Sequence, residues 1–338
     1  MLDGIDLTPI WAGLLAFAVL AYVVMDGFDL GCGILFAIEG GEEDRDTIVN
    51  SIAPVWDGNE TWLVLGGGGL FAVFPLAYAI IMPALYPLVT AMLLALIFRG
   101  VAFEFRFKAH SHTGRRQWDF AFFGGSVVAA LSQGMILGAL LQGIKVQGRA
   151  YAGGWFDWLT PFTLVCGVAV LIGYALLGAT WLIWRTEGDL HARCRRQASL
   201  LGAATLGMIG VVSLWTPFLN PRFLERWFGW PGIALTSPVP ILVLVLAVLF
   251  WRGLARGAHL TPFLCVLGWF VLCFGGLGIS MLPLMVPPDV SIYDAAAPHA
   301  SQAFLLVGAS VLIPTILIYT GFSYWVFRGK VKAGTGYH

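Results

Sequence analysis

Long apolar segments alternate with short polar segments along the whole chain, and this pattern predicts membrane-spanning helices. A hydrocarbon core of ~30 Å requires about 20 consecutive apolar residues in a helix. Nine segments of this kind are present, with limits near residues 9–37, 57–77, 79–103, 120–142, 159–184, 198–219, 233–251, 262–284 and 300–327. The connecting segments are short. We therefore expect an all-α polytopic membrane protein with nine transmembrane helices, forming a single integral membrane domain over residues 1–338.

Two local features of the second apolar segment predict close packing. The turn between it and the third segment falls within residues 74–78, which contain a proline but no charge, so the joint between the two helices must be tight. The segment also contains four consecutive glycines, residues 66–69, without a following Lys-Ser/Thr pair. Such a run indicates close helix packing rather than a phosphate-binding loop.

Composition supports a membrane protein and excludes other classes. Hydrophobic residues make up 59% of the 338 residues and charged residues 11%, against ~25% charged in soluble domains. The 14 tryptophans suit a protein with many membrane–water boundaries. Nineteen basic residues balance nineteen acidic residues, so there is no positive surplus to attract nucleic acid.

The distribution of Lys and Arg predicts the orientation in the membrane, because these residues accumulate in cytoplasmic segments. Fourteen of them follow odd-numbered apolar segments and four follow even-numbered ones. The asymmetry places the N-terminus outside and the C-terminus in the cytoplasm. The fourteen are Arg45, Arg106, Lys108, Arg115, Arg116, Arg185, Arg193, Arg195, Arg196, Arg252, Arg256, Arg328, Lys330 and Lys332, and the four are Lys145, Arg149, Arg222 and Arg226.

Acidic residues inside the apolar segments are the most informative for function. Asp26 and Asp29 lie three residues apart in the cytoplasmic half of the first segment, and Asp57 and Glu60 repeat that spacing where the second segment begins. Four ionised, unpaired acids would cost on the order of 10–14 kcal/mol in a bilayer. Arg99 in the third segment neutralises about one of them. The surplus indicates groups that carry protons or line water.

Each of these residues also has a structural interpretation. Asp57 and Glu60 could serve only as negative charges in the first turn of a helix, where acids are common. Asp26 and Asp29 lie too deep for that, and their structural alternative is a hydrogen-bonded packing device with Arg99.

Two other residues near the acids are open to more than one interpretation. Trp56 is either an anchor at the membrane interface or a donor that fixes a neighbouring carboxylate. Glu104 and Lys108 have the spacing of an ordinary surface ion pair on a helix.

Histidine placement argues against a redox centre in this chain. All six histidines are expected in loops or at the terminus, so no helix interior would present an imidazole to haem or copper. Five cysteines occur without a metal-binding spacing. We therefore expect no metal and no haem bound by this chain. The histidines are His110, His112, His191, His259, His299 and His338.

Several segments together resemble subunit II of the cytochrome bd-type quinol oxidases, a family that includes the cyanide-insensitive oxidases. These are residues 26–31 (DGFDLG), 50–62 (NSIAPVWDGNETW) and 98–106 (FRGVAFEFR). Residues 161–167, 178–181 and 185–188 are similar to the fifth helix of the family. The resemblance covers almost the whole chain, and the Trp-Asp-Gly-Asn motif is its most specific part.

The resemblance implies an architecture and a division of labour. It implies two four-helix bundles plus one peripheral helix, packed against a homologous subunit I that holds the haems (haem b and haem d) and oxidises quinol. It also implies a bacterial cytoplasmic (inner) membrane location, and it allows for a structural quinone and a small single-helix accessory subunit. Subunit II of the family is thought to conduct protons toward the oxygen site. The matching proton-path positions are Asp26, Asp29, Trp56 and Asp57, with Glu60, Arg99 and Glu104 in supporting places.

The sequence thus predicts a subunit of a quinol:oxygen oxidoreductase that reduces oxygen to water with cytoplasmic protons. Two other functions stay open. A proton-coupled secondary transporter would also have acids near the middle of the membrane and Gly- or Pro-interrupted helices, although nine spans without an inverted-repeat charge pattern argue against it. A membrane scaffold would use the acids for assembly alone.

Overall fold

The computed structural model describes residues 4–39 and 41–331, and nearly all of the ordered elements there are helices. The long helices are α1 (Leu7–Phe36), α3 (Trp56–Val73), α4 (Pro75–Lys108), α5 (His112–Gln142), α6 (Pro161–Arg185), α7 (Gly188–Trp215), α10 (Pro238–Ala255), α11 (Thr261–Met281) and α13 (His299–Val326). The short ones are α2 (Glu42–Ile52), η1 (Thr216–Phe218), α8 (Pro221–Phe228), α9 (Gly232–Thr236) and α12 (Ile292–Ala295). Two small antiparallel hairpins join β1 (Val146–Gln147) to β2 (Ala150–Tyr151) and β3 (Leu284–Val286) to β4 (Val290–Ser291).

Eight helical segments in the described ranges are long and apolar enough to cross a membrane. They correspond to every predicted span except the second, and they confirm a polytopic, mostly helical membrane protein. The second predicted span is α3, which has 18 residues and begins with the polar residues Asp57, Asn59 and Glu60. The count of nine spans therefore stays a prediction.

Several predicted boundaries are wrong by more than a turn. α4 continues to Lys108, α5 begins at His112 and α7 begins at Gly188, because these helices extend beyond their apolar segments as charged ends. The helix α2 was not predicted, since its residues are polar and its first turn is acidic. The tight joint between α3 and α4 is confirmed: only Phe74 separates the two helices, and Pro75 occupies the first position of α4.

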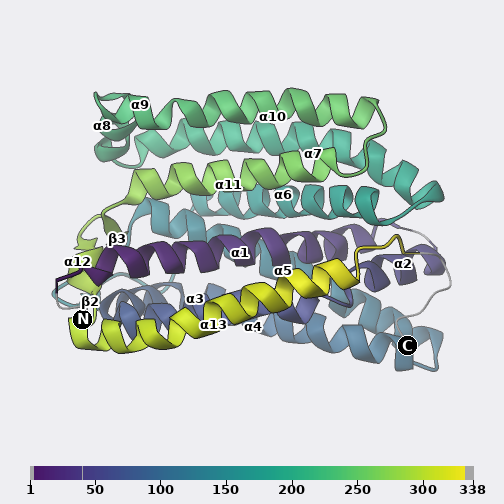
Figure 1. Cartoon of the computed structure of the whole chain (residues 1–338), viewed down its shortest axis with the longest axis horizontal. Coiled ribbons are helices and arrows are strands. Elements are labelled where there is room, and N and C mark those ends of the chain that lie inside the picture. The colour runs from purple at the N-terminus through teal and green to yellow at the C-terminus, as the bar shows by residue number, and fades with distance from the viewer. Residues whose placement is uncertain (1–3, 40, 332–338) are drawn as a thin grey trace.

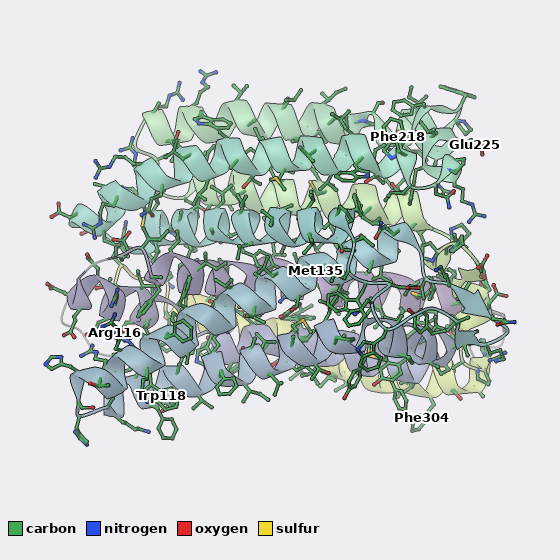
Figure 2. The ribbon with its side chains drawn as sticks, turned by 180° about the vertical axis from the view of Figure 1, so that it is seen from behind. Arg116, Trp118, Met135, Phe218, Glu225 and Phe304 are labelled. Atoms are coloured by element: carbon green, nitrogen blue, oxygen red, sulfur yellow. The ribbon has the colours of Figure 1, made fainter. Side chains whose placement is uncertain are left out.

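The helices form parallel layers (Figure 1). α7 and α10 lie at one edge, α6 and α11 come next, α1 and α5 occupy the centre, and α3, α4 and α13 form the other edge. α13 runs obliquely across this last edge and has little of its surface buried. Large apolar side chains such as Phe218 and Phe304 project from the surface, as expected for residues that face lipid or another subunit (Figure 2).

Glycines set the closest helix contact in the centre. Where α1 crosses α6, Gly31 faces Gly178 so closely that a Cβ on Gly31 would lie 1.8 Å from the carbonyl oxygen of Tyr174. The predicted packing role of the four consecutive glycines is confirmed for two of them: Gly66 and Gly69 face side chains of α1. The other two have open space on their Cβ side.

The two ends of the helix bundle differ. One end carries α2 and the ends of α4 and α6, and the other carries both hairpins, α8, α9 and α12 (Figure 1). α13 ends beside α2: Ser323 of α13 donates a hydrogen bond to the carbonyl of Pro54, two residues after α2 (3.4 Å). We call these the α2 end and the hairpin end. The basic residues predicted to be cytoplasmic belong to elements that meet at the α2 end, apart from Lys332, which lies outside the described residues.

Candidate functional site

Two carboxyl groups are fully buried in α1. Asp26 and Asp29 have no exposed surface, and Asp26 lies ten residues, or about 15 Å, from the end of α1 at Phe36. Arg99 of α4 is equally buried. Its Nη1 lies 3.0 Å from Oε1 of Glu60 on α3 and 3.6 Å from Oδ1 of Asp26. Three helices thus bring three acids and one arginine into one cluster, which we call the carboxylate cluster.

A chain of hydrogen bonds extends the cluster toward α13. Asn59 donates from Nδ2 to Oδ2 of Asp29 (2.6 Å), and the hydroxyl of Tyr324 donates to Oδ1 of Asn59 (2.9 Å). Asn59 is 1% exposed. Through Asn59, Tyr324 of α13 is thus linked to Asp29, almost three hundred residues earlier in the sequence. The same hydrogen bond attaches α13 to the interior.

A second chain leads from the cluster toward α5 and α6. Tyr22 lies one turn before Asp26 on α1, although neither oxygen of the Asp26 carboxyl has a hydrogen-bond partner among the described residues. The Tyr22 hydroxyl accepts a hydrogen bond from Nε2 of Gln133 (2.8 Å), and Tyr174 donates to Oε1 of Gln133 (2.6 Å). These three neutral polar side chains join α1, α5 and α6 on the Tyr22 side of Asp26.

The charges and hydrogen bonds of the carboxylate cluster do not balance within the described residues. Both oxygens of Asp26, Oδ1 of Asp29, and Nε and Nη2 of Arg99 are buried without a hydrogen-bond partner there. One guanidinium faces three acids, of which only Glu60 is partly exposed, at 25% of its side chain. A buried carboxylate without a partner is costly. Bound protons or water molecules are the simplest way to satisfy these groups.

The other predicted site residues lie at the margin of this cluster. Asp57 is exposed on the first turn of α3, and its carboxyl makes no hydrogen bond or ion pair with the described residues. The ring of Trp56 stacks on Phe103 of α4, with centroids 4.8 Å apart and planes 7° apart. Glu104 lies 3.5 Å from Lys108 on the surface, which confirms the predicted helix pair.

Sequence reasoning missed the neutral members of the site. Asn59 lies within the recognised motif, and Tyr22 stands four residues before Asp26, so their positions carried a usable signal. Gln133 is a lone amide in an apolar segment. Nothing in the sequence pairs Tyr324 with Asn59.

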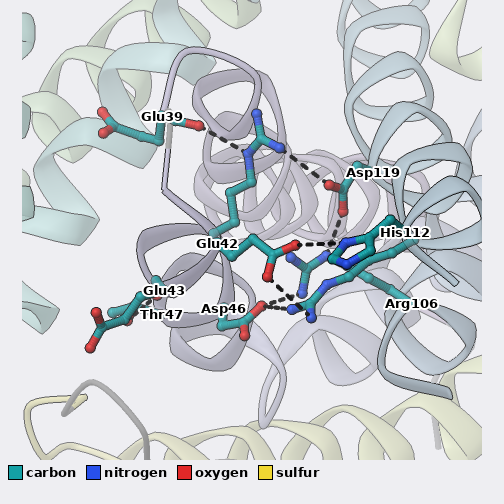
Figure 3. Close-up of polar contacts among 10 residues, drawn as sticks. Glu39, Glu42, Glu43, Asp46, Thr47, Arg106, His112 and Asp119 are labelled. Atoms are coloured by element: carbon teal, nitrogen blue, oxygen red, sulfur yellow. Dashed lines mark hydrogen bonds and ion pairs between the residues drawn. The ribbon is translucent and has the colours of Figure 1, made fainter. Parts of the chain in front are cut away.

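A dense ion network at the α2 end holds α2 over the helix ends (Figure 3). Arg106 of α4 is 1% exposed and lies 2.6 Å from Oδ1 of Asp46 on α2 and 2.6 Å from Oδ1 of Asp119 on α5. Arg45 of α2 also reaches Asp119, at 3.3 Å. Burial by itself would raise the pKa of Asp46, but hydrogen bonds from Arg115 and Arg106 lower it below its usual range.

We expect Asp46→Asn to weaken this attachment of α2. Because the folded-state pKa of Asp46 is lowered, its contribution to stability is present above an unfolded pKa of ~3.9 and is lost as the pH falls through the lower folded value. At pH 7 and low salt the variant should therefore unfold at a lower temperature than the wild type. The difference should shrink with added salt or acid. Thermal unfolding measured across pH and salt checks this, and a difference independent of both would contradict it.

The described histidines lie in the first turn of a helix or between helices. The expectation that all six lie outside helices is wrong for three of them, because the helices extend beyond their apolar segments: His112 and His299 begin helices, and His191 is the fourth residue of α7. His110 and His259 lie outside helices, and His338 lies outside the described residues.

Comparison with known proteins identifies the family. A family model described as cytochrome bd terminal oxidase subunit II matches residues 7–327. The chain is 30% identical to cytochrome bd-I ubiquinol oxidase subunit 2 of Escherichia coli K12, covering 98% of this chain and 97% of that protein. It is 29% identical to cytochrome bd ubiquinol oxidase subunit 2 of Bacillus subtilis 168, covering 97% of each.

A solved structure agrees with these sequence relationships. The bd oxidase of Geobacillus thermodenitrificans contains a chain that matches with a TM-score of 0.72 at 17% identity, over 93% of this chain and 97% of that one. At this identity the match shows a shared fold. Together with the family model and the relatives, it shows that the chain belongs to the cytochrome bd terminal oxidase subunit II family, a membrane subunit that implies a subunit I as its partner.

Proposed function

We propose that this chain stabilises the haem-bearing subunit I and conducts protons from the cytoplasm toward the oxygen-reducing site of that subunit. The complex would oxidise quinol and reduce oxygen to water, as the names of the ubiquinol oxidase relatives suggest. Haem b, haem d and the quinol-oxidising site belong to subunit I in this proposal. This chain contributes titratable groups and binding surface.

The observation that carries the proposal is the surplus of buried acids. Asp26 and Asp29 are fully buried, and three of their four carboxyl oxygens have no hydrogen-bond partner among the described residues. Oxygen reduction consumes protons at a buried site, and chains of carboxylates and water are the usual membrane solution. A purely structural cluster would be expected to satisfy its hydrogen bonds more completely.

The exposure of the acids decreases in the order in which we propose that a proton passes them. Asp57 is exposed, Glu60 one turn further along α3 has a 25% exposed side chain, and Asp26 is buried. The Nη1 atom of Arg99 lies between Glu60 and Asp26 and contacts both. We propose that Asp57 loads this path and that Trp56, through its stack on Phe103, fixes the start of α3 against α4.

We expect Asp57→Asn and Asp26→Asn each to slow quinol oxidation roughly tenfold or more, the effect of losing one acid–base relay. Each change keeps the size of the side chain and removes its titratable proton. Glu104→Gln is the matched control, because Glu104 belongs only to an exposed ion pair. Oxygen uptake per haem, measured on the purified complex, gives the rate.

Assembly must be measured alongside the rate. Wild-type turnover in a fully assembled Asp57→Asn and Asp26→Asn complex would reject the proton role. Loss of subunit I or of haem from these variants, with normal turnover of the remaining complex, would instead favour the scaffold interpretation. The ion pairs of Arg99 with Glu60 and Asp26 are the observation that keeps that second interpretation open.

The orientation is also part of the proposal. We infer nine spans, arranged as two four-helix bundles plus one peripheral helix, with the N-terminus outside. The highly exposed α13 is the natural peripheral helix. This orientation places the α2 end and the nearby acids on the cytoplasmic side.

Reporter fusions test the orientation. A reporter active only in the cytoplasm should be active when fused after Lys332, which lies outside the described residues, because fourteen basic residues favour that side. The same reporter inserted near Pro288, in the hairpin between β3 and β4, should be inactive. The reverse pattern would place the acids on the wrong side for cytoplasmic proton uptake.

A further inference from the structure

Arg185 is a buried cation without an acidic partner in the part of the chain that the structure describes. It is the last residue of α6 and is 5% exposed, and its Nε atom has no hydrogen-bond partner among residues 4–39 and 41–331. Its guanidinium lies over the rings of Trp181 and Trp184, at 5.3 and 5.9 Å from their centroids. Within the described residues its side chain makes no ion pair. The other two buried arginines, Arg99 and Arg106, each contact two carboxylates.

The contacts of Arg185 leave an unmet requirement. A buried charge is stable only when it is paired and its hydrogen bonds are satisfied. The aromatic rings and the negative end of the α6 helix dipole both stabilise the positive charge. Neither supplies an acceptor to Nε.

Arg185 lines a small cavity of about 10 Å³ between α2, α6 and α13. It admits about one oxygen-sized group. Its two polar neighbours are already engaged: Ser51 donates to the Ile48 carbonyl (2.7 Å) and accepts from Trp181 (3.3 Å), while the Tyr324 hydroxyl donates to Asn59. An acceptor for Arg185 must therefore come from elsewhere.

The region next to the cavity is positively charged. Lys330 donates to the carbonyl of Thr186, adjacent to Arg185, at 2.9 Å, and lies 3.2 Å from Nδ1 of His259. Burial lowers the pKa of Lys330, the acid Glu187 raises it, and the positive charge of Arg185 lowers it further. Glu187 is the acid that acts on Lys330. Its single negative charge does not balance the two positive charges of Arg185 and Lys330.

We propose that Arg185, assisted by Lys330, binds a phosphate group at the α2 end, and that an anionic phospholipid supplies it. A phosphate oxygen fits the cavity and offers the charged acceptor that Arg185 lacks. The site lies where the membrane-crossing helices α6 and α13 end, beside Trp184 and Phe327, which is the level of lipid headgroups. The bound group would hold the ends of α6, α13 and α2 together.

The test uses the purified complex with subunit I. Native mass spectrometry counts the phosphatidylglycerol molecules that stay bound after detergent exchange, and nanodiscs with and without phosphatidylglycerol in phosphatidylcholine give the shift in unfolding temperature. The wild type should retain an anionic lipid that Arg185→Gln loses, with at least a tenfold weaker affinity in the variant. Arg256→Gln, an exposed charge at the same end, is the control and should behave as the wild type.

A second arm separates the two sources of phosphate. If inorganic phosphate raises the unfolding temperature of the delipidated wild type but not of Arg185→Gln, while phosphatidylglycerol has no effect, the site binds free phosphate and the phosphate chemistry stands. Equal lipid retention and equal phosphate response in the wild type and Arg185→Gln would overturn the proposal. If Arg185→Gln does not assemble, Lys330→Gln replaces it. That variant should bind phosphatidylglycerol about threefold more weakly or worse, and unchanged binding would overturn the proposal.

Discussion

Arg99→Gln should leave little assembled complex. Among the described residues, Arg99 is the only cation that contacts Asp26 and Glu60, and the substitution removes it. The Arg99 side chain has no exposed surface, so water cannot take its place. Removing one partner of a buried ion pair costs about 3–5 kcal/mol, which is a large part of the 5–15 kcal/mol by which typical domains are stable. The yield of complex and its unfolding temperature measure the effect.

Two further variants show whether the loss arises from uncompensated charge. Arg116→Gln removes an exposed arginine of α5 and should change neither yield nor stability (Figure 2). The triple variant Arg99→Gln, Asp26→Asn, Glu60→Gln removes the cation together with both acids and should recover part of the stability, because contacting residues are not additive. Normal yield of Arg99→Gln alone would show that the acids are already protonated in the folded protein.

Gly31→Ala is expected to prevent α1 from packing against α6. The new Cβ would lie 1.8 Å from the Tyr174 carbonyl oxygen and 2.7 Å from the backbone nitrogen of Gly178. Neither is a flexible side chain that can move aside, so the helices must separate. Overpacking of a core costs about 1–3 kcal/mol, occasionally more, and the rigid backbone contacts place this site at the upper end.

Proteolysis of the membrane-embedded complex and its yield after solubilisation measure the effect of Gly31→Ala. Gly207→Ala is the matched control, because Gly207 also lies in a membrane-crossing helix, α7, and a Cβ there would meet no atom within 4 Å. The control should be neutral or slightly stabilising, since alanine favours the helix. Equal yields of the two variants would show that α1 and α6 are less closely packed than the structure describes.

The sequence predicts the membrane helices well and their ends poorly, for a physical reason. Counting apolar residues locates the part of a helix in hydrocarbon, but α4, α5 and α7 continue as charged helix into water. Counting apolar residues also fails to find α2, because its residues are polar. Ion pairs with Arg106 and its neighbours hold this helix in place.

The acidic members of the site were predictable because charge is expensive in a bilayer and therefore conspicuous in the sequence. Neutral polar side chains cost less free energy in a bilayer and are therefore less conspicuous in the sequence. The hydrogen bond from Tyr324 to Asn59 depends on how α13 crosses α3, which no local pattern encodes. The exposure of Asp57 depends on the rotation of α3 about its axis, and its spacing from Glu60 does not determine that rotation.

The amide of Gln133 gives the hydrogen-bond chain behind Asp26 a fixed direction. Tyr174 donates to the amide oxygen and the amide nitrogen donates to Tyr22, so both hydrogens point toward Tyr22, one turn before Asp26. A hydroxyl or a water molecule can accept one proton and release another, but an amide keeps its N–H and C=O on separate atoms. The amide therefore interrupts proton transfer between Tyr174 and Tyr22, so this hydrogen-bond chain joins α6, α5 and α1 without serving as a proton relay.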